Sequence, residues 1–349
     1  MKATTIGFDL AKTEFQVHGV DAKGKPVVRK QLRRAQILPF FARLSPCTIG
    51  IEACGSAHHW ARKLTELGHT VKLMAPHFVK PYVKANKTDA ADAEAICEAV
   101  ARPNMRFVPV KSVEQQAILA VHRVRSGLVA ERTAQLNRLR GLLSEFGLIA
   151  PRGRRALMER LPLLLADESL PGVARTLFER QSTRIRQLET DISAEETVIL
   201  DWHRNNALSK RLDAVAGVGP ITATALVASF GQGREFDNGR QMAACLGLVP
   251  RQHSSGGKTK LLGISKRGDT YLRMLLIHGA RAVIRTLERR AKGAGNPTDQ
   301  WLVKLLARRN PNVAAVALAN KTVRVIWALL AHDRTYDRNW VGQRVAVAA

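Results

Sequence analysis

The stretch Thr5-Ile6-Gly7-Phe8-Asp9 decides the fold class of the chain, because it is a short apolar run that ends in an acid. A second β-like run at residues 15–20 follows a turn at Lys12-Thr13, and the pair predicts a β-hairpin. Further β-like runs near Val27, Thr48 and Val71 alternate with helical patterns, which cover residues 35–44, 57–67 and 88–101. This alternation predicts a mixed α/β domain over residues 1–106.

Four acids occupy comparable places in this domain: Asp9, Glu52, Asp89 and Asp92. Asp9 and Glu52 each close an apolar run, so both carboxylates are expected at strand ends. Asp89 and Asp92 are three apart in a helical pattern and share one helix face. Hard cations such as Mg²⁺ bind carboxylate oxygens, and two metals can stabilise the attacking and leaving oxygens of phosphodiester transfer. Singly, each acid is better explained as a turn, cap or surface residue, whereas the ordered set of four favours a metal site.

Residues 107–205 change to long helical patterns rich in Leu, Arg, Gln and Glu. Apolar residues such as Ile118, Val124 and Leu139 recur at helical spacing, with breaks at Pro151 and Pro171. The pattern predicts a central antiparallel helical hairpin or coiled coil. Its arginines fit a solvated face and a nucleic-acid groove equally well.

Residues 206–349 form a third region, expected to be mostly helical, that contains the segment Gly217-Val218-Gly219-Pro220. This segment has the form of a helix-hairpin-helix turn, in which Gly217 and Gly219 allow the bend. Amides at the start of the next helix could then bind a backbone phosphate, a contact that positions DNA without reading its sequence. A plain packing corner between two helices is the alternative.

A second informative stretch in this region is the loop Ser254-Ser255-Gly256-Gly257. A serine hydroxyl there could attack phosphorus if another group lowers the cost of its deprotonation. On the residues alone, a flexible loop that only binds phosphate is the better interpretation. The cations expected to contact nucleic acid flank the loop: Arg251, Lys258, Lys260, Lys266 and Arg267.

The composition supports a polyanionic partner, because the formal net charge is +26 and the sequence pI is about 10.9. The cations are spread along the chain, which favours nucleic acid over a membrane surface. Four cysteines show no zinc-binding spacing and predict reduced thiols. The apolar stretch at residues 313–330 is interrupted by Lys321 and Arg324, so a buried helix is expected there instead of a membrane span. The chain enters its first strand without the apolar core of a signal peptide, which predicts a cytoplasmic protein.

In its motifs the chain resembles the DEDD-type transposases of bacterial insertion sequences in the one-ten family, which includes the Piv-type DNA invertases. The resemblance covers essentially the whole chain. It implies a RuvC-like domain of RNase H fold at residues 1–106, a helical or coiled-coil domain for assembly and RNA binding at 107–205, and a transposase domain with a serine nucleophile loop at 206–349. The matching motifs are Ile6-Gly7-Phe8-Asp9, Ile51-Glu52-Ala53, residues 87–93, Gly217-Val218-Gly219-Pro220, Gly247-Leu248-Val249-Pro250-Arg251, Ser255-Gly256-Gly257-Lys258 and residues 263–269.

The resemblance further implies a recombinase that cuts and rejoins donor and target double-stranded DNA, guided by a structured bridge RNA. Mg²⁺ would be held by the four acids, and Ser255 would form a covalent phosphoserine link to DNA. The adjacent Ser254 leaves that assignment open by one residue. The resemblance also implies dimers that pair into tetramers. For this chain we expect action at the bacterial nucleoid, in the cytoplasm. The rival hypotheses are a RuvC-like endonuclease that uses water as nucleophile and a non-catalytic nucleic-acid-binding protein.

Overall fold

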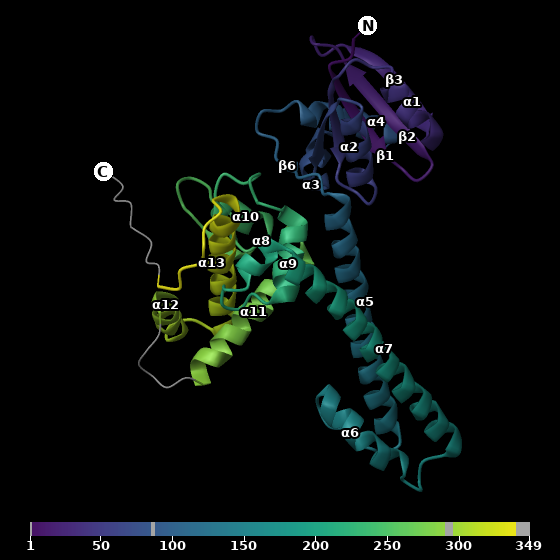
Figure 1. Cartoon of the computed structure of the whole chain (residues 1–349), viewed down its shortest axis with the longest axis vertical. Coiled ribbons are helices and arrows are strands. Elements are labelled where there is room, and N and C mark those ends of the chain that lie inside the picture. Colours follow the sequence, from purple (N-terminus) through teal and green to yellow (C-terminus); the bar gives the residue numbers. More distant parts are fainter. Residues whose placement is uncertain (1, 85–87, 290–295, 340–349) are drawn as a thin grey trace. The chain divides into compact units, whose positions relative to one another are not determined.

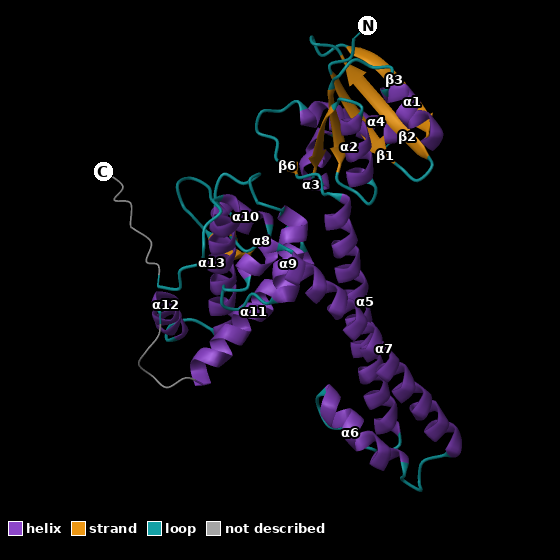
Figure 2. Ribbon diagram, viewed as in Figure 1, coloured by secondary structure: helices purple, strands orange, loops and turns teal. Residues whose placement is uncertain are grey.

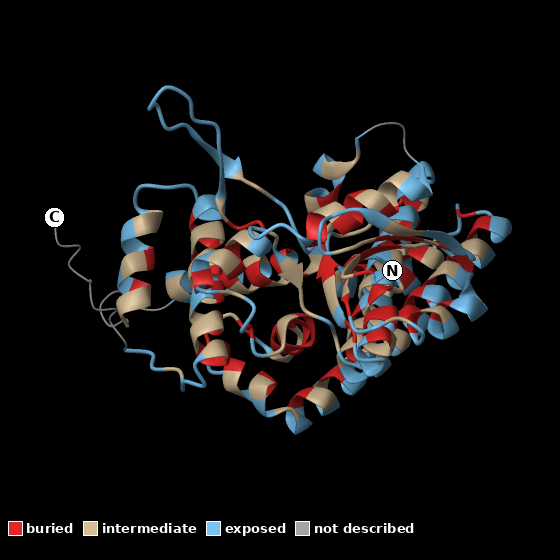
Figure 3. Cartoon of the chain, turned by 90° about the horizontal axis from the view of Figure 1, so that it is seen from above, coloured by how far each residue is buried: buried red, intermediate tan, exposed pale blue. Residues whose placement is uncertain are grey.

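The structure, a computed structural model, describes residues 2–84, 88–289 and 296–339. Lys87 of the acidic motif therefore lies outside the described residues. The chain divides into two compact units, Met1–Val113 and Glu114–Ala349 (Figure 1). In the first unit buried residues concentrate on the strands and on the helix faces that pack on them, and in the second unit they lie on the inner faces of the helices (Figure 3).

The first unit is built on a six-stranded mixed sheet with the order β3-β2-β1-β4-β5-β6 (Figure 2). β1, β2 and β3 form an antiparallel meander, β4 and β5 run parallel to β1, and β6 is antiparallel to β5. The strands are β1 (Thr5–Leu10), β2 (Glu14–Val20), β3 (Pro26–Arg33), β4 (Thr48–Glu52), β5 (Thr70–Met74) and β6 (Phe107–Val108). The five predicted strand runs are confirmed, and β6 is a short strand that the sequence pattern did not reveal.

Helices cover the two faces of this sheet differently. Because side chains alternate along a strand, Ile6 and Phe8 of β1 lie on one face, in a core with Phe41 and Trp60. α4 packs on the opposite face, over β1, β2 and β4. α1 and α2 contribute to the core on the first face. The helical elements are η1 (Arg34–Gln36), α1 (Ile37–Phe41), α2 (Ala57–Glu66), α3 (Pro76–Val79), η2 (Lys80–Tyr82) and α4 (Asp89–Val100).

The second unit begins with two long helices, α5 (Val113–Glu145) and α7 (Gly172–Asn205), joined through the shorter α6 (Arg154–Leu165). The ion pairs Arg125–Glu196 at 2.5 Å and Glu131–Arg184 at 2.7 Å show that α5 and α7 run antiparallel, as the sequence predicts. The apolar pattern does not bury every member, since the Val124 side chain is 51% exposed.

The rest of this unit is mostly helical, and its largest hydrophobic core joins α8 to α13. One two-stranded hairpin, β7 (Pro250–Gln252) and β8 (Leu261–Ile264), interrupts the helices. Among the described helices, α13 alone is long and apolar enough to cross a membrane, but its buried side chains belong to this core. The helices are α8 (Ala207–Leu212), α9 (Pro220–Phe230), α10 (Gly239–Cys245), α11 (Thr270–Arg289), α12 (Pro297–Leu306) and α13 (Pro311–Ala331).

Of the two boundaries expected from the sequence, the one after residue 106 lies near the division between the compact units, and the one after residue 205 falls inside the second unit. The long helices and the C-terminal helices fall in one unit, and the boundary lies at Val113 and Glu114. The division at residues 106 and 205 stays a prediction about separate roles. The four cysteines are free thiols, with Cys47 and Cys97 buried and Cys54 and Cys245 exposed.

Candidate functional site

Asp9 and Glu52 lie at the same end of neighbouring parallel strands. The register pairs Phe8 with Ile51, which places the following residues, Asp9 and Glu52, side by side at the strand ends. Gly50 faces Val100 of α4, and the alternation of the strand puts Glu52 on that same face. The sequence prediction of two acids at adjacent strand ends therefore agrees with the sheet.

Asp89 and Asp92 occupy the first turn of α4. Thr88 is the N-cap, and its hydroxyl accepts a hydrogen bond from the Ala91 amide at 3.2 Å. The helix approaches β1 closely because Gly7 has no side chain: a Cβ there would overlap the Ala93 carbonyl oxygen. This close approach brings the first turn of α4 over the end of β1.

Three of the four acids form a compact cluster. One carboxylate oxygen from each of Asp9, Asp89 and Asp92 lies within 4.8 Å of the other two. Burial raises the pKa of Asp9 to about 6, and the negative charges of Asp92, Asp89 and Glu52 contribute to the rise. Glu52 is thus an electrostatic neighbour of Asp9, although it is outside the compact group of three.

This arrangement fits a divalent cation. The donors are all carboxylates, the ligand type that Mg²⁺ and Ca²⁺ prefer. Three like charges at such short range repel one another, and the raised Asp9 pKa reports that repulsion together with the burial. A bound cation would relieve it. Asp9, Asp89 and Asp92 would hold the metal, with Glu52 beside them.

Ser254 and Ser255 lie at the tip of the β7–β8 hairpin, and both are exposed. Gly256 and Gly257 have φ values of 53° and 75°, and the Lys258 amide donates to the Ser255 carbonyl at 3.0 Å. Positive φ at both central residues is typical of a type I′ turn, which suits a two-residue hairpin and favours glycine. The Ser254 hydroxyl accepts a hydrogen bond from the Gln252 side chain at 2.9 Å.

The base of this hairpin is held by backbone contacts that only glycine allows. A Cβ at Gly247 would overlap the Arg267 backbone, and one at Gly268 would overlap the Cys245 carbonyl. The buried guanidinium of Arg273 donates to the carbonyls of Leu246 at 3.0 Å and Arg267 at 2.8 Å. Sequence reasoning missed Arg273, because nothing in a helical pattern marks an arginine that packs inward.

The five predicted nucleic-acid contacts on and below the hairpin lie mostly at the surface. In the described part of the chain none of them forms an ion pair, so their charges are available to an anion. Lys266 has a positive φ of 55°, which is uncommon outside glycine. These cations are Arg251, Lys258, Lys260, Lys266 and Arg267.

The glycine-rich turn before α9 follows the short helix α8. Gly217 has a φ of 82° and packs directly against the backbone of Gly279 in α11. A Cβ on Gly279 would overlap the carbonyl oxygen of Gly217. Gly219 has a φ of −98° and a ψ of 179°, an extended conformation open to any residue. The bend therefore requires Gly217 alone, which corrects the expectation that both glycines allow it. Pro220 at the first helical position removes one amide donor.

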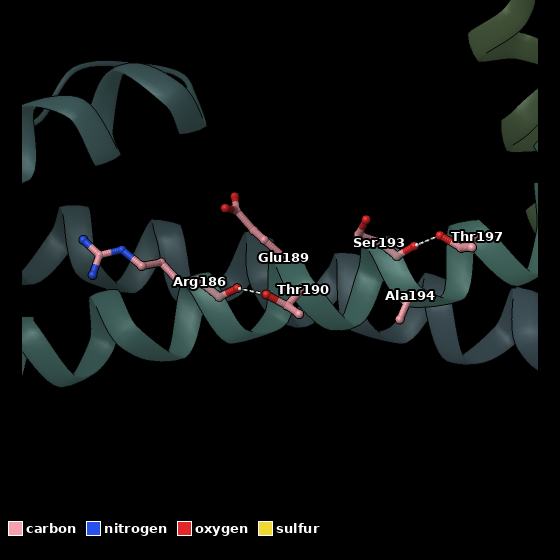
Figure 4. A pocket seen from close by; sticks show the side chains of 6 residues that line it. All are labelled: Arg186, Glu189, Thr190, Ser193, Ala194 and Thr197. Atoms are coloured by element: carbon pink, nitrogen blue, oxygen red, sulfur yellow. Dashed lines mark hydrogen bonds between the residues drawn. The ribbon is translucent and has the colours of Figure 1, made fainter.

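A shallow hollow of about 640 Å³ lies along one face of α7 (Figure 4). Thr190 and Thr197 use their hydroxyls inside the helix, donating to the Arg186 and Ser193 carbonyls at 3.3 Å and 3.0 Å. Glu189 pairs with Arg154 of α6 at 3.0 Å. The hollow thus presents few groups to a ligand, and none of the predicted site residues lines it.

Each unit therefore gathers part of the predicted residues. The first unit brings together the acids, and the second carries the serine hairpin, its cations and the glycine turn. A carboxylate cluster at the strand ends of a mixed sheet, in a chain with a net charge of +26, is typical of metal-dependent enzymes that act on nucleic-acid phosphodiesters.

Comparison with known proteins identifies the family. Residues 6–147 match a DEDD transposase domain, and residues 209–294 match the domain described as transposase IS116/IS110/IS902 family. A probable family 20 transposase of Pseudomonas aeruginosa is 56% identical over 342 residues, 96% of this chain and 99% of that protein. The transposase for insertion sequence element IS1111A of Coxiella burnetii is 43% identical over 341 residues, 95% of this chain and 90% of that protein.

A more distant relative is the pilin gene-inverting protein of Moraxella bovis, 24% identical over 305 residues, 82% of this chain and 81% of that protein. The chain belongs to the IS116/IS110/IS902 family of insertion-sequence transposases. The DEDD domain implies an RNase H-like fold, and the mixed six-stranded sheet agrees with it.

Proposed function

We propose that this transposase cuts and rejoins DNA through a phosphoserine intermediate, with Mg²⁺ held by Asp9, Glu52, Asp89 and Asp92. The observation that carries the proposal is the carboxylate cluster of the first unit, in which three acids converge within 4.8 Å and the pKa of Asp9 rises to about 6. Bound Mg²⁺ would supply charge stabilisation at the scissile phosphate.

In the proposed reaction, the Ser255 hydroxyl loses its proton and its oxygen forms a bond to phosphorus. The bond from phosphorus to one DNA oxygen breaks, and that oxygen takes up a proton. The new phosphodiester preserves the energy of the old one, so the reverse attack by a DNA hydroxyl rejoins the strand without ATP. Arg251, Lys258 and Lys266 are the cations proposed to stabilise charge on the phosphoryl group.

We further propose that a structured RNA guides the choice of donor and target DNA, and that subunits act as dimers which pair into tetramers. The net charge of +26 supports binding of more than one nucleic acid. Base pairing would carry the sequence recognition and leave the protein to contact backbones. Excision assays with and without the RNA test this part.

The adjacent serines provide a matched pair for testing the nucleophile. Labelled element-end DNA is incubated with Mg²⁺ and protein, with and without the RNA, and the covalent adduct is resolved on a denaturing gel and mapped by mass spectrometry. Ser255→Ala should abolish the adduct, while Ser254→Ala should retain it because its hydroxyl bonds to Gln252 within the hairpin. Asp9→Asn should also abolish it.

The competing function is a RuvC-like endonuclease in which water attacks phosphorus. The acid cluster alone would serve that reaction. Retained cleavage by Ser255→Ala, together with lost cleavage by Asp9→Ala, would establish the hydrolytic mechanism and refute the phosphoserine proposal.

A further inference from the structure

We propose that one exposed patch of the sheet binds the backbone of the DNA strand whose scissile phosphate reaches the acid cluster. This patch, called the β3 platform below, consists of the exposed Arg29, Gln31 and Arg33 on β3 and the half-buried Gln16 on β2. The inference rests on the proposed function, since it extends the same site by a binding surface for its substrate.

The strand register connects the β3 platform directly to the acids. Asp9 pairs with Gln16 across β1 and β2, and Gln16 pairs with Gln31 across β2 and β3. These residues form one row across the sheet, and Glu52 lies beside Asp9 at the other end of it. With about 4.8 Å between strands, the row places Gln31 on the order of 10 Å from Asp9.

The β3 platform lies on the α4 side of the sheet. Leu32 belongs to the core on the opposite side, and the Lys30 ammonium lies 5.5 Å from the centre of the Phe40 ring. Alternation along β3 therefore puts Arg29, Gln31 and Arg33 on the same face as Asp9. α4 covers β1, β2 and β4 on this face, and the three β3 residues remain exposed.

The charges of the two arginines are available to bind an anion. Within the described residues, neither Arg29 nor Arg33 forms an ion pair with a carboxylate. Glu14, which pairs with Arg33 in the strand register, instead accepts a hydrogen bond from the Gln31 side chain. Arginine binds phosphate through two parallel hydrogen bonds, and such contacts would offset the repulsion between the acid cluster and an approaching DNA strand.

The spacing of the arginines also suits a DNA backbone. Arg29 and Arg33 are four residues apart on one strand, on the order of 13 Å. This span is long enough for the two guanidinium groups to reach different phosphates of one DNA strand. The β3 platform therefore fits several consecutive phosphates that lead to the acids.

A second explanation for these arginines is protection of an edge strand, because β3 is the outer strand of the sheet and charged side chains prevent edge-to-edge association. That role requires charge but no contact with DNA. It predicts that loss of the arginines changes aggregation and leaves DNA binding unaltered.

The test compares two double variants that each remove two positive charges from the full-length protein. R29Q/R33Q alters the β3 platform, and K23Q/K25Q alters the exposed turn between β2 and β3. Binding to fluorescein-labelled duplexes of element-end and scrambled sequence is measured in EDTA over a range of salt. R29Q/R33Q should lower the slope of log affinity against log salt by about 2, equally for both duplexes. K23Q/K25Q should match wild type, and R29K/R33K should keep most of the slope.

Several outcomes would overturn the inference. One is a slope for R29Q/R33Q equal to that of K23Q/K25Q, and another is a loss confined to binding of an RNA stem-loop. Should the double variant not fold, R29Q and R33Q singly must each lower the slope by about 1. Binding is measured without metal, so it does not depend on catalysis. If Asp9→Asn failed to block cleavage, the proposed function would be refuted, and the binding result for the β3 platform could still be interpreted.

Discussion

Asp9 illustrates how a single residue combines the signals of sequence and structure. Its place after an apolar run predicts a strand end. The folded sheet adds the neighbours that raise the pKa of its carboxyl group. Burial and the charges of Asp92, Asp89 and Glu52 raise its pKa to about 6, from an ordinary value of 3.8. The sequence could place the four acids in order, but it could not give this pKa, which depends on their mutual distances.

The raised pKa makes the metal-free cluster destabilising at neutral pH. The folded protein keeps a proton on Asp9 between about pH 4 and 6, whereas the unfolded chain has lost it, so stability falls as pH rises through this window. Asp9→Asn should therefore stabilise the metal-free protein at pH 7 by roughly 1 to 2 kcal/mol, a value reduced for the partly exposed carboxylate. The gain should vanish near pH 4. Urea unfolding in EDTA at both pH values measures it, and a gain that is independent of pH would contradict the assignment.

At the scale of elements, the sequence predicts most where periodicity is local. The strands of the first unit follow from alternating apolar runs, and α4 follows from its cap Thr88 and an alanine-rich pattern. Where the β7–β8 hairpin lies, the sequence indicates only a basic loop. Its doubled glycine suits a type I′ turn. The backbone contacts at the base of the hairpin join segments about twenty residues apart, and no local pattern predicts them. Arg273 and the overlap at Gly247 and Gly268 arise from that packing.

The close backbone contacts at the hairpin base predict that alanine destabilises the protein at Gly268 and not at Gly263. Gly268→Ala should destabilise the protein by at least about 2 kcal/mol, because φ is 72° and the new Cβ would overlap the carbonyl oxygen of Cys245. Gly263→Ala in β8 is the matched control, since its Cβ would meet nothing within 4 Å and should change stability by less than about 1 kcal/mol. Urea unfolding compares the two. Equal losses of stability in the two variants would show that the hairpin base can accommodate a side chain at Gly268.

At the scale of the whole molecule, each unit has hydrophobic cores of its own. The first unit buries the two faces of its sheet against α1, α2 and α4, and the second buries its apolar residues among α5 to α13. Sequence composition predicts a polyanionic partner for the entire chain. The change to long helical patterns after residue 106 lies close to the boundary at Val113 and Glu114, where α5 begins.

Separate cores predict two thermal transitions, and the acid cluster predicts which of them responds to metal. Mg²⁺ at a hundredfold excess over its Kd should stabilise the first unit by about 2.7 kcal/mol, because it binds only the folded cluster. For a unit of this size the corresponding shift is on the order of 10 °C. Differential scanning calorimetry of the full-length protein, with and without Mg²⁺, should show this shift in one transition only.

Asp9→Asn provides the control for this experiment, because it removes a metal ligand and keeps the side-chain volume. In that variant neither transition should respond to Mg²⁺, and at pH 5 the wild-type response should weaken because protonation of Asp9 competes with the metal. A Mg²⁺ shift that persists in Asp9→Asn, or that moves both transitions together, would mean that the cation binds elsewhere or that the two units unfold as one.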